Sequence, residues 1–293
     1  MPENAILPPG NPLPRGRKAD FSHIYAQPDP RQYFRVLDEL DYQIPQRALP
    51  VFRTVLAASR RDGRKRTVLD LCCSYGINSA LLLSRGDPAQ VAARYLSQAA
   101  ARLSAGEMAE ADWRYYARRH GDPRIVGLDA STPAIKYATR AGLLDEGWAE
   151  NLETAPPSAE LRAGVADVGL IICTGGVGYV GVPTFEALLH AVRDPADLWL
   201  VVFVLRVFDY AKVAALLKEY GLVTERLPRT FPQRRFVNDG ERTAAIRDVK
   251  RRGLDPAGKE ADGWYHADCF LTRPAAAASV PAQQLLASVS GAW

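Results

Sequence analysis

The apolar positions between residues 67 and 221 fall into short, nearly continuous runs that alternate with stretches of helical spacing. The strongest runs occupy 67–73, 124–129, 166–173 and 197–205. Runs of this kind are typical of strands that are covered on both faces. Segments of helical spacing follow them at about 78–84, 131–142, 183–193 and 209–220. This alternation predicts a doubly wound α/β sheet, mostly parallel, with right-handed crossovers.

The remaining segments decorate this alternation. Helices are predicted over 31–58, and a helical pair separated at Gly106 is predicted within 86–122, between the first two strong strands. A short strand is expected at 148–152. Beyond residue 221 we expect strands at 222–227, 235–238 and 264–272, with a polar helix near 241–252. Late strands of this kind can close one side of the sheet as a hairpin.

Composition excludes several classes of protein. The net charge is only +4, and the short basic runs lie beside Gly or Pro, which favours a solvated surface over a nucleic-acid groove. No run of 18 apolar residues occurs, so no membrane span is expected. The four cysteines, Cys72, Cys73, Cys173 and Cys269, contain no CxxC pair, so neither a metal site nor a disulfide framework is expected. The N-terminus lacks the shape of a secretory signal, so a cytoplasmic location is the default expectation.

Ligands of such sheets bind beyond the carboxyl ends of the strands, near the switch in strand order. Asp129 ends the second strong strand, where a carboxylate can accept both hydroxyls of a ribose; it could instead serve only as a carboxylate at a helix entry. The turn after Asp70 is short and holds a single glycine, Gly76, which leaves little open backbone for a pyrophosphate. The pattern therefore indicates a nucleoside whose other end is not a phosphate.

Taken in order, the segments from about 67 to 272 resemble the class I S-adenosylmethionine-dependent methyltransferases. The family's first strand ends as hhDhGxGxG, and the matching run here is Val-Leu-Asp70-Leu-Cys72-Cys73-Ser74-Tyr75-Gly76. The aspartate and the final glycine match, while Cys72 and Ser74 replace two glycines. The resemblance implies S-adenosylmethionine as cofactor. It implies these contacts: Asp70, Cys72, Ser74, Gly76 and Asn78 along the methionine part; Asp129, Ala130 and Ser131 at the ribose; Asn151, Leu152 and Glu153 at the adenine; and Cys173, Thr174 and Gly175 toward the methionine part and substrate.

The resemblance also implies a division of the chain. We expect a flexible arm over 1–20, a helical lid region over 21–66, a Rossmann-like cofactor-binding domain of seven strands over 67–273, and a flexible tail over 274–293. The lid region and the 86–122 insertion could cover the cofactor, contact a second copy in a homodimer, or merely decorate the fold.

Aromatic side chains and one histidine complete the candidate chemistry. A sulfonium favours aromatic faces, so a lining is expected from some of Tyr25, Tyr33, Tyr42, Tyr75 and Tyr179, although each could be structural. Tyr75 and Tyr179 are the candidates for catalysis among them. His266, near the last strand, is the candidate general base.

The expected function is methyl transfer to a small-molecule acceptor in small-molecule biosynthesis, without a metal. Three alternatives remain open. The same fold could act as a lyase, in which the cofactor's own amino group attacks its γ-carbon and methylthioadenosine is released. The run Gly176-x-Gly178-x-x-Gly181, with Arg206 after the next strand, could instead bind NADP for an oxidoreductase. Finally, the chain could bind S-adenosylmethionine without catalysis.

Overall fold

A computed structural model describes residues 19, 21–60, 66–84 and 86–289. Its centre is a seven-stranded sheet with the order β3-β2-β1-β4-β5-β7-β6. Neighbouring strands pair in parallel from β3 to β5, and β7 runs antiparallel to both β5 and β6. The strands are β1 (Thr67–Leu71), β2 (Arg124–Asp129), β3 (Glu146–Ala149), β4 (Val168–Thr174), β5 (Trp199–Leu205), β6 (Leu222–Arg235) and β7 (Trp264–Pro274). The predicted doubly wound, mostly parallel sheet is confirmed.

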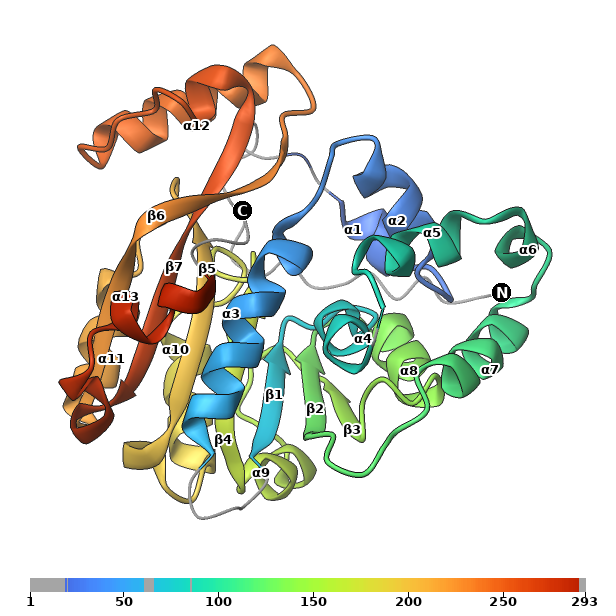
Figure 1. The fold of residues 1–293 in the computed structure, drawn as a ribbon, viewed down its shortest axis with the longest axis horizontal. Helices are drawn as coiled ribbons and strands as arrows, with labels where there is room; N and C mark the ends of the chain where they lie inside the picture. Colours follow the sequence, from blue (N-terminus) through green and yellow to red (C-terminus); the bar gives the residue numbers. More distant parts are fainter. Residues whose placement is uncertain (1–18, 20, 61–65, 85, 290–293) are drawn as a thin grey trace.

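Helices cover both faces of this sheet (Figure 1). The α-helices are α1 (Ser22–Tyr25), α2 (Arg31–Asp38), α3 (Ile44–Ser59), α4 (Ile77–Leu83), α5 (Ala89–Leu96), α6 (Gln98–Ala101), α7 (Ala105–Tyr115), α8 (Thr132–Arg140), α9 (Ala159–Val165), α10 (Val182–Ala191), α11 (Ala211–Glu219), α12 (Asp239–Arg251) and α13 (Ala282–Leu285). Short 3₁₀ turns are η1 (Pro195–Asp197), η2 (Glu260–Asp262), η3 (Ala275–Ser279) and η4 (Ala287–Val289). One core forms between the sheet and α3, α4 and α8, and a second forms between the sheet and α9, α10 and α11.

The strand order changes direction at β1. From β1 the chain runs outward through β2 to β3, and it then crosses to β4, which pairs with β1 on the side opposite to β2. Asp70 lies opposite Gly127 of β2 and Ile172 of β4. The carboxyl ends of three strands therefore meet at the switch point, where open α/β sheets bind their ligands.

Polar contacts fasten the N-terminal helices and the 86–122 insertion to this framework. The guanidinium of Arg31 in α2 donates to the carbonyl of Ala100 in α6 (2.7 Å). Fully buried Asp112 of α7 accepts hydrogen bonds from the hydroxyls of Tyr95 and Tyr137, both at 2.6 Å. Since Tyr137 belongs to α8, the inserted helices are held against the main domain by a buried polar network.

Several predicted strands differ in their bounds. The strand expected at 148–152 lies at 146–149, and the strand expected at 222–227 continues as far as Arg235 in β6. Of the strand expected at 235–238, only Arg235 belongs to a strand, and residues 236–238 lie beyond its end. The register of β6 with β7 shifts between Arg226 and Thr230, and again between Pro232 and Arg234. Such bulges interrupt the period-two alternation, which explains why the sequence pattern does not show the continuous strand.

The tail expected to be flexible from residue 274 is packed as far as Val289. Ala282, Leu286 and Val289 are buried in the core on the α3 side, and Arg273 forms an ion pair with Glu225 (2.5 Å). Small alanine-rich segments conceal this packing, because few large apolar side chains carry it. Residues 290–293 lie outside the described residues, as does the predicted flexible arm, apart from Ala19. Within the described ranges, no helix combines the length and the apolar character needed to cross a bilayer.

Candidate active site

The turn after β1 has the backbone of a glycine-rich turn although most of its residues are not glycine. Cys72, Ser74 and Gly76 have φ angles of +57°, +52° and +76°, all in the left-handed region. A side chain in this region costs roughly 1–2 kcal/mol, because its Cβ approaches the following carbonyl. The two residues that replace glycines therefore keep the glycine conformation, and the turn holds that strain.

Asp129 joins the end of β2 to this turn. Its Oδ2 accepts a hydrogen bond from the backbone N–H of Ser74, and its Oδ1 accepts one from the backbone N–H of Ser131, both at 2.9 Å. Burial raises the pKa of Asp129, while the hydrogen bonds from Ser131 and Ser74 lower it. Each carboxylate oxygen has a further lone pair, so the half-buried side chain can still accept hydrogen bonds from a ligand. The carboxylate thus serves the helix entry and remains able to bind a ribose.

Asp70 lies behind the turn and is completely buried. Its Oδ1 accepts from Asn78 Nδ2 (2.9 Å) and its Oδ2 from Ser79 Oγ (3.4 Å), while Asn78 Nδ2 also donates to Thr174 Oγ1 (3.2 Å). Burial raises the pKa of Asp70 to about 7; the hydrogen bond from Asn78 opposes this shift and the charge of Asp129 adds to it. The network ties the ends of β1 and β4 together, so Asp70 acts on the site through Asn78 and Thr174.

Two thiols, those of Cys72 and Cys173, lie at the carboxyl ends of β1 and β4. The sulfurs of Cys72 and Cys173 each lie 2.7 Å from the position that a Cβ at Gly176 would occupy. Residue 176 must therefore be glycine, since any side chain would overlap both sulfurs. The interaction with Cys173 and burial together raise the pKa of Cys72, so this thiol stays neutral. In the part of the chain that the structure describes, no three His, Cys, Asp or Glu side chains are grouped to hold a metal ion.

Residues 21–30, which we call the strap, are anchored to the turn. The buried hydroxyl of Tyr75 lies 2.8 Å from the carbonyl oxygens of both Ile24 and Gln27, which accept its hydrogen. Ser131 Oγ donates to the carbonyl of Tyr25 (2.6 Å). Tyr75 was predicted as a catalytic candidate, and its hydroxyl is instead engaged in holding the strap.

Tyrosines from separate segments converge beside Asp129. Burial raises the pKa of Tyr25, and the neighbouring Tyr42, Tyr179 and Asp129 raise it further. The ring of Tyr33 lies 5.9 Å from that of Tyr25 and 6.2 Å from that of Tyr42, measured between centroids. The structure therefore brings together the aromatic residues that the sequence offered as a possible lining, with Tyr179 half exposed at the rim.

Glu153 has a different neighbourhood from the one expected at an adenine edge. Its Oε1 accepts from the backbone N–H groups of Gly181 (2.8 Å) and Thr184 (3.2 Å) and from Thr184 Oγ1 (2.5 Å), which caps the start of α10. Asn151 Oδ1 accepts from the backbone N–H of Glu153 (3.0 Å), and Leu152 is buried. A carboxylate at the start of α10 also occupies the place where the glycine-rich alternative requires a pyrophosphate.

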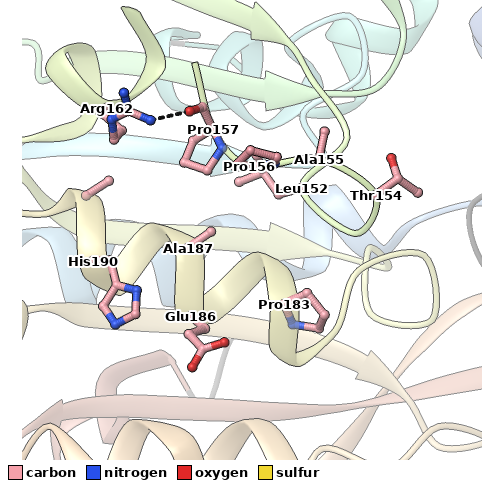
Figure 2. A pocket seen from close by; sticks show the side chains of 11 residues that line it. Leu152, Thr154, Ala155, Pro156, Pro157, Arg162, Pro183, Glu186, Ala187 and His190 are labelled. Atoms are coloured by element: carbon pink, nitrogen blue, oxygen red, sulfur yellow. Dashed lines mark hydrogen bonds between the residues drawn. The ribbon is translucent and has the colours of Figure 1, made fainter. Parts of the chain in front are cut away.

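A groove of about 510 Å³ adjoins this segment (Figure 2). Leu152 and the prolines that follow it form one wall, and Ala187 and His190 of α10 form the other. Arg162 of α9 donates to the carbonyl of Pro157 at one end (2.5 Å). The groove lies between the loop after β3 and α10, next to the segment that the sequence assigned to the adenine.

His266 belongs to another polar cluster. Its Nδ1 is hydrogen-bonded to Thr230 Oγ1 (2.9 Å), and its pKa is lowered to about 4 by burial and by the charges of Arg206 and Lys259. It is therefore neutral near pH 7 and a weak base. None of these contacts links it to Asp129, so its role as general base stays a prediction.

The positions that an NADP site would need are already occupied by other groups of the chain. A Cβ at Gly178 would lie 2.5 Å from the ring of Phe208, so that glycine serves close packing. Arg206 is buried, donates to Glu260 (2.5 Å) and to the carbonyl of Asp255 (2.8 Å), and is thereby committed to internal partners. A 2′-phosphate would have to displace a buried ion pair, which is costly.

One residue of this region escaped the sequence analysis. Gln233 is buried on β6 with its side chain against Gly175 at the end of β4. It lies at the register shift of β6, where alternation fails, so no signal in the sequence identified it.

No protein-family model matches the chain, and no curated protein matches it. Solved structures with a similar fold include a TehB-like SAM-dependent methyltransferase from Corynebacterium glutamicum (15% identity, TM-score 0.38, 75% of this chain and 86% of that one). Others are the plantazolicin methyltransferase BamL (11%, 0.43, 82% and 89%) and a SAM-dependent methyltransferase from Aquifex aeolicus (14%, 0.38, 87% and 100%). These values are too low to support an inference about activity, which rests on the geometry of the site.

Proposed function

We propose that this chain is an S-adenosylmethionine-dependent methyltransferase acting on a small-molecule acceptor. The observation that carries the proposal is the contact between Asp129 and the backbone of Ser74. This contact supports the proposal, because it holds a carboxylate that can accept hydrogen bonds from ribose hydroxyls beside a turn with left-handed backbone.

The chain's own groups fit such a cofactor. The hydroxyl oxygen of Ser74 is buried and has no hydrogen-bond partner among the described residues, so it is available to a ligand. Cys72 offers a neutral thiol wall, and the phenols of Tyr25 and Tyr42 offer aromatic faces. The cofactor, when bound, supplies a methyl group on a positively charged sulfur, which such faces attract.

The strap and the buried network have separate roles in this scheme. The strap covers the turn and excludes water, while Asp70 and Asn78 hold the ends of β1 and β4 at a constant spacing. Half-exposed Tyr179, on the loop after β4, is placed to contact the acceptor. Positioning of this kind is the main protein contribution to an in-line displacement.

The strap also favours a second candidate, the lyase. Its attachment by Tyr75 and Ser131 covers the turn, and a covered site suits a reaction within a single bound molecule. The two reactions differ in the nucleoside that they release: methyl transfer leaves S-adenosylhomocysteine, and the lyase leaves methylthioadenosine.

Product analysis therefore tests the proposal. The protein is incubated with S-adenosylmethionine and a panel of small amines, phenols and carboxylic acids, and nucleosides are separated by liquid chromatography with mass detection. S-adenosylhomocysteine that forms only with an acceptor supports methyl transfer. Methylthioadenosine without an acceptor assigns the lyase, and binding with neither product assigns a non-catalytic role.

A further inference from the structure

Gln233 carries a buried polar atom for which the described residues supply no partner. Its side chain is 3% exposed, and its carbonyl oxygen Oε1 has no hydrogen-bond partner among the described residues. A buried acceptor without a donor is destabilising, because the group has lost its water. Such an atom is open to a hydrogen-bond donor on a bound ligand.

The fold brings this carboxamide to the end of β4. Gln233 lies where the register of β6 shifts between Pro232 and Arg234, and a bulge of this kind redirects a side chain. Its Nε2 lies 3.0 Å from the position of a Cβ on Gly175, the residue after β4. Its backbone carbonyl accepts from the N–H of Gln43 (2.9 Å), which fastens β6 to the segment before α3.

The same fastening brings Tyr42 to this place. Burial raises the pKa of Tyr42, whose hydroxyl interacts with Tyr33 and lies near Arg234, Cys173 and Tyr179. Tyr42 and Gln233 therefore lie near the end of β4, whose last residue, Thr174, accepts a hydrogen bond from Asn78. The carboxamide is part of the wall of the proposed cofactor site.

We propose that Gln233 accepts a hydrogen bond from the α-ammonium group at the amino-acid end of bound S-adenosylmethionine. This inference rests on the proposed function. If Asp129 of β2 holds the ribose, the rest of the cofactor extends across β1 toward β4, where Gln233 lies. The amino-acid end carries a carboxylate, which only accepts, and an ammonium, which only donates. Because the Gln233 carbonyl oxygen can only accept a hydrogen bond, it suits the ammonium group and not the carboxylate.

Calorimetric titration with two nucleosides tests the assignment, since S-adenosylhomocysteine has the amino-acid end and methylthioadenosine lacks it. Gln233→Met is expected to lower the affinity for S-adenosylhomocysteine by about tenfold or more, and to change the affinity for methylthioadenosine by less than about twofold. Gln233→Glu is expected to keep or improve the affinity for S-adenosylhomocysteine, because a carboxylate also accepts from an ammonium. Thermal unfolding of the unliganded Gln233→Met protein should be unchanged or shifted to higher temperature, since it removes an unpaired atom.

Gln46 of α3 provides a matched control. Its Oε1 is also buried and has no hydrogen-bond partner among the described residues, but it borders the small cavity lined by Tyr33, Tyr42 and Pro45 and not Gly175. Gln46→Met should leave the ratio of the two affinities unchanged. The assignment is overturned if Gln233→Met loses the same affinity for both nucleosides. It is also overturned if Gln233→Glu loses as much affinity for S-adenosylhomocysteine as Gln233→Met does. A wild-type protein that binds neither nucleoside overturns the proposed function itself, and this inference with it.

Discussion

The backbone N–H of Ser74 donates a 2.9 Å hydrogen bond to Asp129, which joins the turn after β1 to the end of β2. The carboxylate that holds this turn lies at the carboxyl end of β2, the edge at which open α/β sheets bind their ligands. The same bond therefore serves stability and, in the proposed function, the position of the ribose.

Replacing Asp129 by Asn is expected to weaken binding of S-adenosylhomocysteine by about tenfold to a hundredfold, because hydrogen bonds to a charged acceptor are the stronger ones. Calorimetry measures the affinity. Asp167→Asn, a change at an exposed carboxylate paired with Arg193, is the control and should have no effect. Equal affinities in wild type and Asp129→Asn would contradict the ribose role.

Replacing Ser74 by Gly is expected to raise the free energy of unfolding by up to about 1 kcal/mol, because it relieves a left-handed side chain and removes an unpaired buried hydroxyl. Ser74→Val should lower it by more than about 1 kcal/mol, since a β-branched residue tolerates positive φ poorly. Urea unfolding followed by circular dichroism gives both values. A loss of stability in Ser74→Gly would show that the turn is not strained.

Asp70 is expected to make stability depend on pH. Its folded pKa of about 7 lies above the ordinary value of 3.8, so the folded state binds the proton more tightly than the unfolded state. The stability contributed by protonated Asp70 is therefore fully present below pH 3.8, and it is lost as the pH rises from there through about 7. Asp70→Asn should gain stability relative to wild type between about pH 5 and pH 8, by a few kcal/mol at most. A difference that stays constant across this range would be incompatible with a protonated Asp70.

Replacing Tyr75 by Phe is expected to release the strap. The change leaves the carbonyls of Ile24 and Gln27 without their donor, at a cost of about 1–3 kcal/mol. Hydrogen exchange by mass spectrometry should show faster exchange over residues 21–30. Tyr210→Phe is the matched control, because the buried Tyr210 hydroxyl has no partner among the described residues. Unaltered exchange in Tyr75→Phe would mean that other contacts hold the strap.

The sequence predicted the architecture well because that information is local. The seven buried residues of β5 and the capped start of α8 at Ser131 are each visible in a few consecutive positions. The sequence also identified the turn after Asp70, because Asp70 and Gly76 match the motif of the family that the sequence resembles. The packed segment after residue 274 was missed, because its few apolar positions become informative only against β6 and α3.

The candidate site was harder to derive, because its side chains have competing partners. Glu153 and Tyr75 lie close to where they were expected, yet one caps α10 and the other holds the strap. Residue type and position along a strand end cannot reveal such partners, which come from distant parts of the chain. Gln233 shows the converse, since a bulge places an otherwise unremarkable polar residue at the end of β4.

The central claim is that Asp129 and the turn at Ser74 form a site for S-adenosylmethionine. It is tested most directly by calorimetric titration of the wild-type protein with S-adenosylhomocysteine and, separately, with NADPH. The account predicts saturable binding of S-adenosylhomocysteine at one site per chain and no binding of NADPH. Saturable binding of NADPH without any of S-adenosylhomocysteine would contradict it.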